Sequence, residues 1–518
     1  MANQRKAGAV LSYLSIGVST AIQLLYTPFL VRCLGQSEYG LYSLVSSIIG
    51  YLTILDFGFG NAIIVYTAKY RAKNDIDAEK KLQGMFKIIF YLIAVFSMML
   101  GMLLFLGTDS IFRNSMSGDE INKAKIMMLI LIFNLGMTFA FNIYSSIIAA
   151  YEKFVFQKLI AIIGIILKPL VMLPLLIIGF KSIAMVCVLT IINAFILISN
   201  YAYCRNKLNV RPKFSGFDKK LLKIVLGYSI WIFLAIVVDK VNWSVDNFIL
   251  GIVSGTIAVS IYSIAGQINT IFVNLSTAVS SVFLPKMSKM IERGARGEEL
   301  TSEFIKVGRV QFHILFLALS GFVIFGKFFI RMWVGIDYDE SYYVALCLIV
   351  PVFFSLLQSL GLSIMQAMNK YRFKALTTFA MAFINIAISF LMASKFGPIG
   401  AALGTTIAIV LNNIIVINIY YYKAIKINVL KFWAEISVLM VKLLPAIVAT
   451  LLLLVVFKPS NLIALVVFAP IYVLLYSGTV LLFSLNKYER HLLRSFLSAI
   501  RSRAPKTKAQ SKTQRRSR

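Results

Sequence analysis

Charged side chains stand inside long apolar stretches of the sequence, where an ionisable group is costly. Lys168 lies in the apolar run 155–179, and Asp239 and Asp246 lie in the run 222–250. A charge at the centre of a bilayer costs at least about 2.5–3.5 kcal/mol on insertion scales, so such residues indicate ion or substrate sites. We interpret Lys168 as a cation that attracts an anionic substrate into a central cavity. The structural alternative is a buried salt bridge.

The run 222–250 carries a polar face. Asp239, Asn242 and Asp246 follow one another at spacings of three and four residues, which places them on one side of a helix. Lys240 lies beside this face. The face could bind a proton or Na⁺ for coupling, or it could line a cavity in which Lys240 balances Asp239. Hydrogen bonding to another helix is the structural alternative.

The apolar run 39–62 contains an acid followed by two glycines, because Asp56 precedes Gly58 and Gly60. Glycine loosens a helix, and unwound backbone at membrane depth persists only where protein or a water-filled cavity satisfies its polar groups. The pattern predicts an ion site at Asp56 and a hinge at Gly58 and Gly60. The alternative is that the span ends here, with Asp56 at the cytoplasmic interface.

Uncharged polar residues repeat at helical spacing in three apolar runs, one in the first half of the chain and two in the second. Helices with such stripes do not face lipid, so the stripes predict a polar cavity shared by both halves. The alternative is interhelical hydrogen bonding, which contributes only about 0.6 kcal/mol per contact. The predicted cavity-lining residues are Asn134, Asn142, Gln267, Thr270, Asn274, Thr277 and Gln366.

Membrane-spanning helices must position these side chains. The 518 residues are 59% hydrophobic and 14% charged, whereas soluble domains are about 45–50% apolar and about 25% charged. Each span needs roughly 20 apolar residues. We therefore predict an all-α polytopic membrane protein with about fourteen transmembrane helices. The predicted spans are 8–31, 39–62, 85–107, 126–150, 155–179, 182–203, 222–250, 256–284, 307–330, 341–367, 373–394, 398–421, 436–457 and 461–484.

Basic residues are concentrated in alternate loops. The formal net charge is +31, but this distribution follows the positive-inside rule and is not that of a nucleic-acid-binding surface. We therefore predict no nucleic-acid partner and place both termini in the cytoplasm. The segment 487–518 is predicted to be a basic amphipathic helix and a disordered tail. It either binds anionic lipid or is a solvated tail without a dedicated partner.

Two parts of the sequence resemble each other at an offset near 220 residues. For example, Gly40–Leu44 corresponds to Ser260–Ile264. Many transporters are built from related halves around a central site. We predict two six-helix lobes, 1–210 and 211–425, followed by transmembrane helices 13 and 14 in the segment 426–486.

Catalytic and metal-binding patterns are weak. The two histidines, His313 and His491, lie far apart, and the four cysteines have no CxxC spacing. A histidine-based metal cluster or a Ser-His-Asp set is therefore not expected. No glycine-rich phosphate loop is present either, so ATP is not expected to drive the chain directly. We predict no catalytic residue, no metal site and no cofactor.

Three motifs resemble one known family. They are Leu34–Ser43 (LGQSEYGLYS), Leu55–Gly58 (LDFG) and Phe396–Ala402 (FGPIGAA). They are similar to the polysaccharide transporter family of the multidrug/oligosaccharidyl-lipid/polysaccharide (MOP) export superfamily, whose familiar members are Wzx-type O-antigen and capsule flippases. In organisation, the resemblance extends over all fourteen predicted spans.

The resemblance implies a V-shaped pair of six-helix lobes and alternating access. It implies a flippase that moves undecaprenyl-diphosphate-linked oligosaccharide from the cytoplasmic to the outer leaflet of the bacterial inner membrane. Basic cavity residues would bind the substrate, and a proton or Na⁺ gradient would supply energy. Membrane lipids and a polysaccharide polymerase are the expected partners, and the protein is expected to be a monomer. By position, the candidates are Arg32, Lys168 and Lys240 for the diphosphate and Asp56, Asp239 and Asp246 for the coupling ion.

Two other functions stay open at this point. A drug/cation antiporter of the same superfamily would share the fold and the acids, but a cationic Lys168 in the cavity opposes a cationic substrate. A membrane enzyme of polysaccharide assembly would need a substantial outer loop for chemistry on the sugar. The longest predicted outer loop is roughly residues 108–123, so the flippase is favoured.

Overall fold

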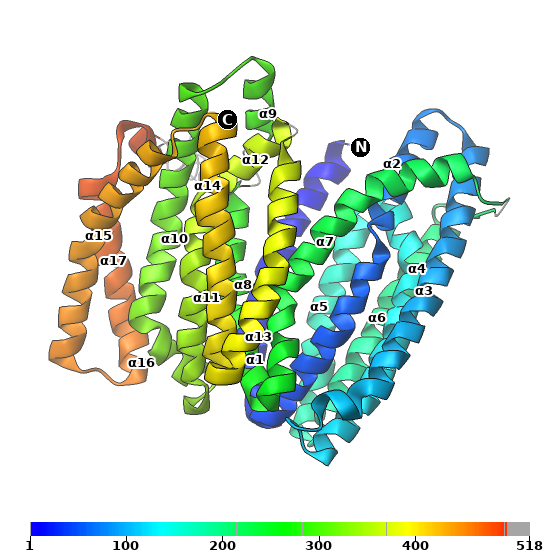
Figure 1. Cartoon of the computed structure of the whole chain (residues 1–518), viewed down its shortest axis with the longest axis horizontal. Coiled ribbons are helices and arrows are strands. Elements are labelled where there is room, and N and C mark those ends of the chain that lie inside the picture. The colour runs from blue at the N-terminus through cyan, green and yellow to red at the C-terminus, as the bar shows by residue number, and fades with distance from the viewer. Residues whose placement is uncertain (1, 214–215, 281–283, 369, 492, 495–518) are drawn as a thin grey trace, which may run out of the picture.

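Helices make up nearly all of the protein (Figure 1). The computed structural model describes residues 2–213, 216–280, 284–368, 370–491, 493 and 494. No strand occurs in those ranges, and the predicted all-α class is confirmed. Along the chain the α-helices are α1 (Ala2–Leu52), α2 (Phe59–Ala72), α3 (Ile76–Phe112), α4 (Gly118–Ala150), α5 (Phe154–Ile177), α6 (Ser182–Asn206), α7 (Lys219–Val253), α8 (Gly255–Ser280), α9 (Leu284–Glu292), α10 (Glu298–Trp333), α11 (Glu340–Leu357), α12 (Ser359–Ala367), α13 (Tyr371–Ile409), α14 (Ile417–Tyr420), α15 (Val429–Phe457), α16 (Asn461–Ile463) and α17 (Ala469–Thr479).

The helices form two groups that meet along a central seam. Figure 1 shows α2 to α6 together on one side, and α10 and α11 on the other. Between them, α1 packs against both α5 and α8, and α7 packs against α13. The last long helices, α15 and α17, pack against α10 at the far edge. Helix α1 therefore contacts both groups.

Tight glycine turns join consecutive helices at equivalent places in the two groups. Gly35 inside α1 has φ 80°, and Gly255 between α7 and α8 also has φ 80°. Gly179 between α5 and α6 has φ 101°, and Gly397 inside α13 has φ 54°. Side chains strongly disfavour positive φ, so glycine permits these turns without a loop. The two glycine pairs lie close to the repeat offset that the sequence motifs suggested.

Eleven helical segments in the described part of the chain are long and apolar enough to cross a membrane. Two of them, Val10–Ala72 and Tyr371–Ile425, each cover two predicted spans, and the predicted span 222–250 lies in α7. Large apolar side chains such as Leu106 and Leu482 are 66% and 70% exposed on the outer surface of the bundle. Lipid is the solvent that suits such a surface. The protein is multi-pass, and the count of fourteen spans stays a prediction.

Candidate functional site

The carboxylate of Glu120 joins the two helix groups next to the turn at Gly35. Glu120 belongs to the first turn of α4, where its Oε2 accepts a hydrogen bond from the Ser117 backbone N–H at 2.9 Å. Its Oε1 accepts from the hydroxyls of Ser37 in α1, at 2.6 Å, and Thr256 in α8, at 2.7 Å. One side chain thus ties three helices together, including helices from both sides of the seam.

Backbone packing reinforces this contact. A Cβ atom at Gly40 would lie 1.8 Å from the Thr256 carbonyl oxygen, so α1 and α8 approach as closely as only glycine permits. Nearby, the Ser115 hydroxyl donates to the carbonyl of Gly251 at 2.7 Å. These residues lie at or near loops that the positive-inside pattern assigns to the outer face. We call the contact made by Ser37, Gly40, Ser115, Glu120, Gly251 and Thr256 the outer latch.

Gln267 continues the seam from the outer latch along α8. Its side-chain oxygen accepts hydrogen bonds from Gln23 at 3.1 Å and Thr27 at 2.9 Å, both in α1. Its amide donates to the hydroxyl of Tyr39, also in α1. The structure therefore places this predicted cavity residue at the boundary between the two groups, where opening of the seam would expose it.

The three predicted diphosphate-binding cations have different surroundings. Lys168 is half-buried in α5, and its ammonium donates to the Tyr42 hydroxyl of α1 at 3.5 Å. Among the described residues, no carboxylate forms an ion pair with Lys168, so the salt-bridge alternative is not what the structure contains. Lys240 is half-buried in α7. Arg32 is exposed in α1, three residues before the turn at Gly35, and donates to the Met332 carbonyl at 3.1 Å.

Asp246 in α7 is deeply buried, with 3% of its surface exposed. Its Oδ2 accepts hydrogen bonds from the Thr405 hydroxyl of α13 at 2.6 Å and from the Tyr262 hydroxyl of α8. Its Oδ1 has no hydrogen-bond partner within the described ranges. Asp246 therefore carries an acceptor atom that the surrounding protein does not use.

Further oxygen atoms surround this carboxylate. The Asn385 side-chain oxygen accepts from Ser389 at 2.9 Å and from Thr405 at 3.3 Å. Ser389 also donates to the Ala401 carbonyl at 3.2 Å. Carboxylate, amide, hydroxyl and backbone oxygens are the donors that hard cations prefer, and half-helix ends in transporters coordinate Na⁺ in this way. The cluster fits a small cation or a proton.

Asp56 occupies a break between two helices. It ends a 3₁₀ turn over Thr53–Asp56, and its Oδ1 accepts a hydrogen bond from the Asn142 amide of α4 at 2.9 Å. Phe57 and Gly58 then adopt positive φ values of 49° and 73°, and α2 begins at Phe59. The helical path thus restarts after Asp56 and does not end in a loop. That Gly58 and Gly60 act as a hinge stays a prediction.

Part of the polar stripe in α4 holds two helices together. Asn134 is buried, and its amide donates to the Thr190 hydroxyl of α6 at 3.0 Å. Its side-chain oxygen accepts from the Asn193 amide, also of α6, at 2.7 Å. These contacts are the interhelical hydrogen bonds that the sequence left open as an alternative, and a cavity-lining role for Asn134 stays a prediction.

The remaining predicted residues differ in exposure. Thr270 and Gln366 are exposed, in α8 and α12, and Asn274 is half-buried in α8. The side chains of Asp239 and Thr277 lie outside the described part of the structure. The structure therefore brings together Asp56 with Asn142, but it does not gather all the predicted cavity residues around one point.

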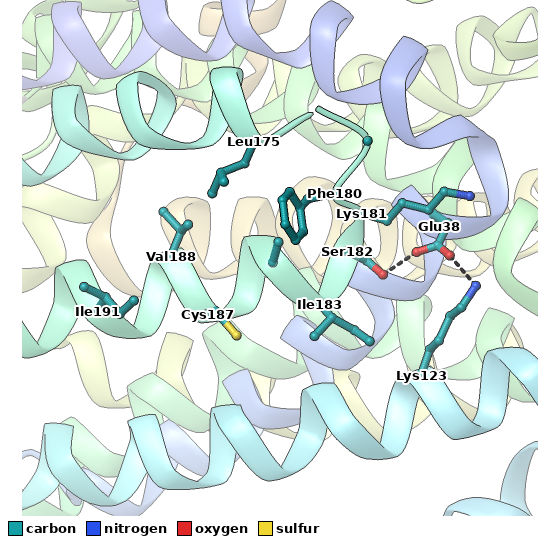
Figure 2. Close-up of a pocket in the computed structure, with 12 residues that line it drawn as sticks. Glu38, Lys123, Leu175, Phe180, Lys181, Ser182, Ile183, Cys187, Val188 and Ile191 are labelled. Carbon is teal, nitrogen blue, oxygen red and sulfur yellow. Dashed lines mark hydrogen bonds and ion pairs between the residues drawn. The ribbon is translucent and has the colours of Figure 1, made fainter. Parts of the chain in front are cut away.

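Figure 2 shows a lateral cavity of about 530 Å³ that the sequence did not suggest. Apolar side chains, including Phe180 and Val188, line most of it. At one end Glu38 of α1 accepts a hydrogen bond from the Lys123 ammonium of α4 at 2.7 Å and another from the Ser182 hydroxyl at the start of α6. This polar corner is already paired, so it fixes three helices to one another.

The residues that surround Asp246 were not predicted from the sequence. Asn385 and Ser389 are four residues apart in the run 373–394, and Thr405 follows in the next run. The i, i+4 pair of polar residues inside an apolar run was a usable signal, because it marks one helix face. Nothing local connected that face to Asp246, which lies more than a hundred residues earlier.

Comparison with known proteins identifies the family. The sequence model of the family described as polysaccharide biosynthesis protein matches residues 29–343, which is more than half of the chain. The chain belongs to this family. A Shigella flexneri protein named as an O-antigen transporter is 24% identical over 420 residues, which cover 78% of this chain and 94% of that protein. The resemblance to the polysaccharide transporter family is therefore confirmed.

Comparison with solved structures shows that this protein has a known fold. The lipid II flippase MurJ in an inward closed conformation superposes with a TM-score of 0.72 at 17% identity, covering 94% of this chain and 99% of that one. An inward-facing multidrug resistance MATE family transporter of the MOP superfamily gives a TM-score of 0.62 at 14% identity, covering 78% and 96%. The fold is that of MOP transporters, and the family member is a transporter and not an enzyme.

Proposed function

We propose that the protein flips an undecaprenyl-diphosphate-linked oligosaccharide repeat unit from the cytoplasmic to the outer leaflet of the bacterial inner membrane. The observation that carries this proposal is the half-buried ammonium of Lys168, which contacts the Tyr42 hydroxyl and no described carboxylate. Family membership and the relative named as an O-antigen transporter support it.

A diphosphate supplies the anion that Lys168 lacks. Charge-assisted hydrogen bonds between an ammonium and phosphate oxygens are stronger than bonds between neutral groups. Lys240 lies on α7, which packs against α13 and α8 as well as against α1, and we propose it as a second cation for the diphosphate. A cationic drug would be repelled by the same charges. For this reason we favour the flippase over a drug/cation antiporter.

The outer latch supports alternating access. It joins the helix groups on the face that the positive-inside pattern places outside, so this arrangement receives substrate from the cytoplasmic side. Outward opening must then break the two bonds that Glu120 makes to Ser37 and Thr256. Gln267 and its partners in α1 would separate in the same step and become available to sugar hydroxyls.

Energy for this movement would come from an ion gradient, and Asp246 is our coupling residue. Its unpartnered Oδ1, together with the oxygens of Asn385, Ser389 and Thr405, fits Na⁺ or a proton. Binding would strengthen the contact that the Asp246–Thr405 bond already makes between α7 and α13. No resident cofactor is needed for this scheme. We expect the protein to work as a monomer beside a polysaccharide polymerase.

Reconstitution tests the function. The purified protein is placed in liposomes with a polyprenyl-diphosphate oligosaccharide under an imposed Na⁺ or proton gradient. A membrane-impermeant sugar-oxidising probe then reports the leaflet of the sugar. Wild type should move the oligosaccharide, Lys168→Ala should slow this by about tenfold or more, which is the loss of one charge-assisted bond, and Lys168→Arg should retain part of the rate. Lys158→Ala, on the same helix, is the matched control.

Two results would contradict the proposal. If Lys168→Ala moves the oligosaccharide as fast as wild type, the cation does not hold the diphosphate. If wild type moves no oligosaccharide but expels a cationic dye, the protein is a drug/cation antiporter. Leaflet transfer without polymerisation separates the flippase from an assembly enzyme, because only the latter changes the covalent structure of the sugar.

A further inference from the structure

A polar cavity of about 430 Å³ lies away from the seam, among α2, α3, α4 and the linker between α6 and α7. Three cationic side chains line it: Arg71 near the end of α2, Lys80 in the first turns of α3, and Arg211 in the linker. All three residues are exposed. We call this cavity the α2–α3 pocket.

The wall of the α2–α3 pocket is built from a buried acid and an aromatic ring. Glu79 is 6% exposed, and its Oε1 accepts hydrogen bonds from the Tyr151 hydroxyl at 2.7 Å and from the Gln83 amide at 2.9 Å. The Arg71 guanidinium stacks 3.4 Å from the centre of the Tyr151 ring. The hydrogen bond to Glu79 fixes the Tyr151 side chain. The Tyr151 ring in turn holds the Arg71 guanidinium in place by a cation–π contact.

The cations of the pocket differ from neighbouring cations in having no acidic partner. Lys81, the next residue after Lys80, lies 2.6 Å from the Asp77 carboxylate. Within the described ranges, no carboxylate lies at ion-pair distance from Arg71, Lys80 or Arg211. With Glu79 as the one acid of its lining, the pocket is net positive. An anion from outside the chain would complete it.

The surroundings of the pocket indicate a membrane surface. In α2, the Lys69 ammonium lies 5.9 Å from the centre of the Tyr66 ring. Ile76, which also lines the pocket, is 63% exposed. Tyrosines and basic residues gather where headgroups meet hydrocarbon, and an exposed apolar side chain beside cations suits a lipid. A soluble anion would make no use of the apolar rim.

We propose that the α2–α3 pocket binds the phosphate headgroup of an anionic phospholipid. The phosphate oxygens accept hydrogen bonds from Lys80 and Arg211 and from the guanidinium of Arg71, which is held ready by Tyr151. The acyl chains leave past Ile76. Basic pockets between transmembrane helices on the cytoplasmic side commonly hold such lipids. The site lies apart from Lys168 and the seam, and it would fasten α2 and the α6–α7 linker to the membrane surface.

Lipid binding to the full-length protein tests this site. Purified protein in a mild detergent is titrated with cardiolipin, and bound lipid is counted by native mass spectrometry. The double variant Lys80→Gln/Arg211→Gln should weaken binding at the tightest site by about 30-fold, since each basic residue near an anionic surface contributes about fivefold. The exposed pair Lys81→Gln/Lys207→Gln removes the same charge from the same elements and should leave binding within about twofold.

The charge-preserving double variant Lys80→Arg/Arg211→Lys should keep cardiolipin bound, which also shows that both positions tolerate substitution. Equal weakening by the two charge-removing doubles would overturn the proposal, because only net charge would then matter. Unchanged binding in Lys80→Gln/Arg211→Gln would overturn it as well. In a parallel titration with inorganic phosphate alone, tight binding of phosphate without retention of cardiolipin would assign the pocket to a soluble anion and not to a lipid.

Discussion

Two buried carboxylates, Asp246 and Glu489, carry the same charge but have different partners. Their residues are 3% and 4% exposed. Glu489 accepts hydrogen bonds from the Arg309 guanidinium at 2.7 and 3.1 Å and from the backbone N–H of Asn486 at 2.9 Å. Asp246 accepts bonds only from hydroxyls, and within the described residues no cation is paired with it.

We interpret this difference as that between a structural acid and the proposed coupling acid. A buried carboxylate costs several kcal/mol unless a charge or a proton compensates it. At Glu489 the compensating charge is permanent, because Arg309 also contacts Glu435 of α15 at 3.0 Å and the Ser484 carbonyl at 2.9 Å. The cluster clamps α10, α15 and the segment after α17. At Asp246 the described residues supply no cation, and we propose that an exchangeable proton or cation compensates the charge, as a coupling site requires.

The largest expected effect is on stability and comes from breaking the permanent pair. Arg309→Ala leaves Glu489 buried without its cation, and we expect the free energy of unfolding to fall by about 3–5 kcal/mol. Reversible denaturation of the purified protein in mixed micelles measures this. The control is Arg331→Ala, which removes a half-exposed arginine bonded to Asp339 at 2.5–3.0 Å and should lower the free energy of unfolding much less than Arg309→Ala does. Equal losses in both variants would remove the distinction between a buried and a surface pair.

The next effect is on transport and comes from neutralising the unpaired acid. Asp246→Asn should lower ion-driven transport by about 100-fold, towards the upper end of usual coupling free energies. Stability should be unchanged or higher, because no buried charge remains to be compensated. Asp337→Asn, at an exposed position in the predicted outer loop, should preserve transport. If Asp246→Asn instead unfolds the protein and a rescued sample still transports with the same ion dependence, Asp246 is structural like Glu489.

The sequence predicted the positions of the helices better than the hydrogen bonds between them. Apolar runs of about 20 residues fix where helices lie, because each run must span hydrocarbon on its own. The acid at Asp246 was visible for the same reason: a charge in such a run is conspicuous. Its partners Tyr262 and Thr405 were not identified, since a hydroxyl in an apolar helix bonds its own backbone just as readily.

The same limit applies to the acids and amides of the first lobe. Asp56 and Asn142 were each predicted, as an ion site and as a cavity residue, and the structure shows that they bond to each other. Asn134 has the same residue type and belongs to the same stripe as Asn142, yet it bonds α6. Spacing along one helix fixes which face a residue occupies, but the identity of the facing helix depends on packing of the whole bundle.

A smaller effect is expected where an acid has one neutral partner. Asp56 is half-buried and accepts from Asn142, so Asp56→Ala and Asn142→Ala should each lower the free energy of unfolding by about 1 kcal/mol. A double-mutant cycle should give a coupling energy of about 0.5–1.5 kcal/mol. Unfolding of the four proteins under identical conditions measures it. A coupling energy near zero would mean that the Asp56–Asn142 bond does not stabilise the fold. The predicted ion and cavity roles would then be the better account of both residues.

Titration of Glu489 should change the stability of the protein only in acid, so its effect at neutral pH is the smallest expected. Burial raises the pKa of this carboxyl, but the His313 imidazole, 3.9 Å away, and hydrogen bonds from Arg309 and the Asn486 backbone outweigh burial and lower the pKa from 4.5 to about 2. Because the pKa is lower in the folded protein, the stabilisation is present above about pH 4.5 and is lost as the pH falls towards 2.

Other carboxylates also titrate in acid, so the useful quantity is the difference between wild type and Glu489→Gln. Their difference in unfolding temperature should be constant from pH 7 to about pH 5 and should shrink steadily below pH 4.5. If the difference instead moves in favour of wild type as the pH falls from 7 to about 5, the pKa is raised on folding and Glu489 is protonated in the folded protein. The clamp would then lack its ion pair, and Glu489 would resemble Asp246 in depending on a proton for its place in the core.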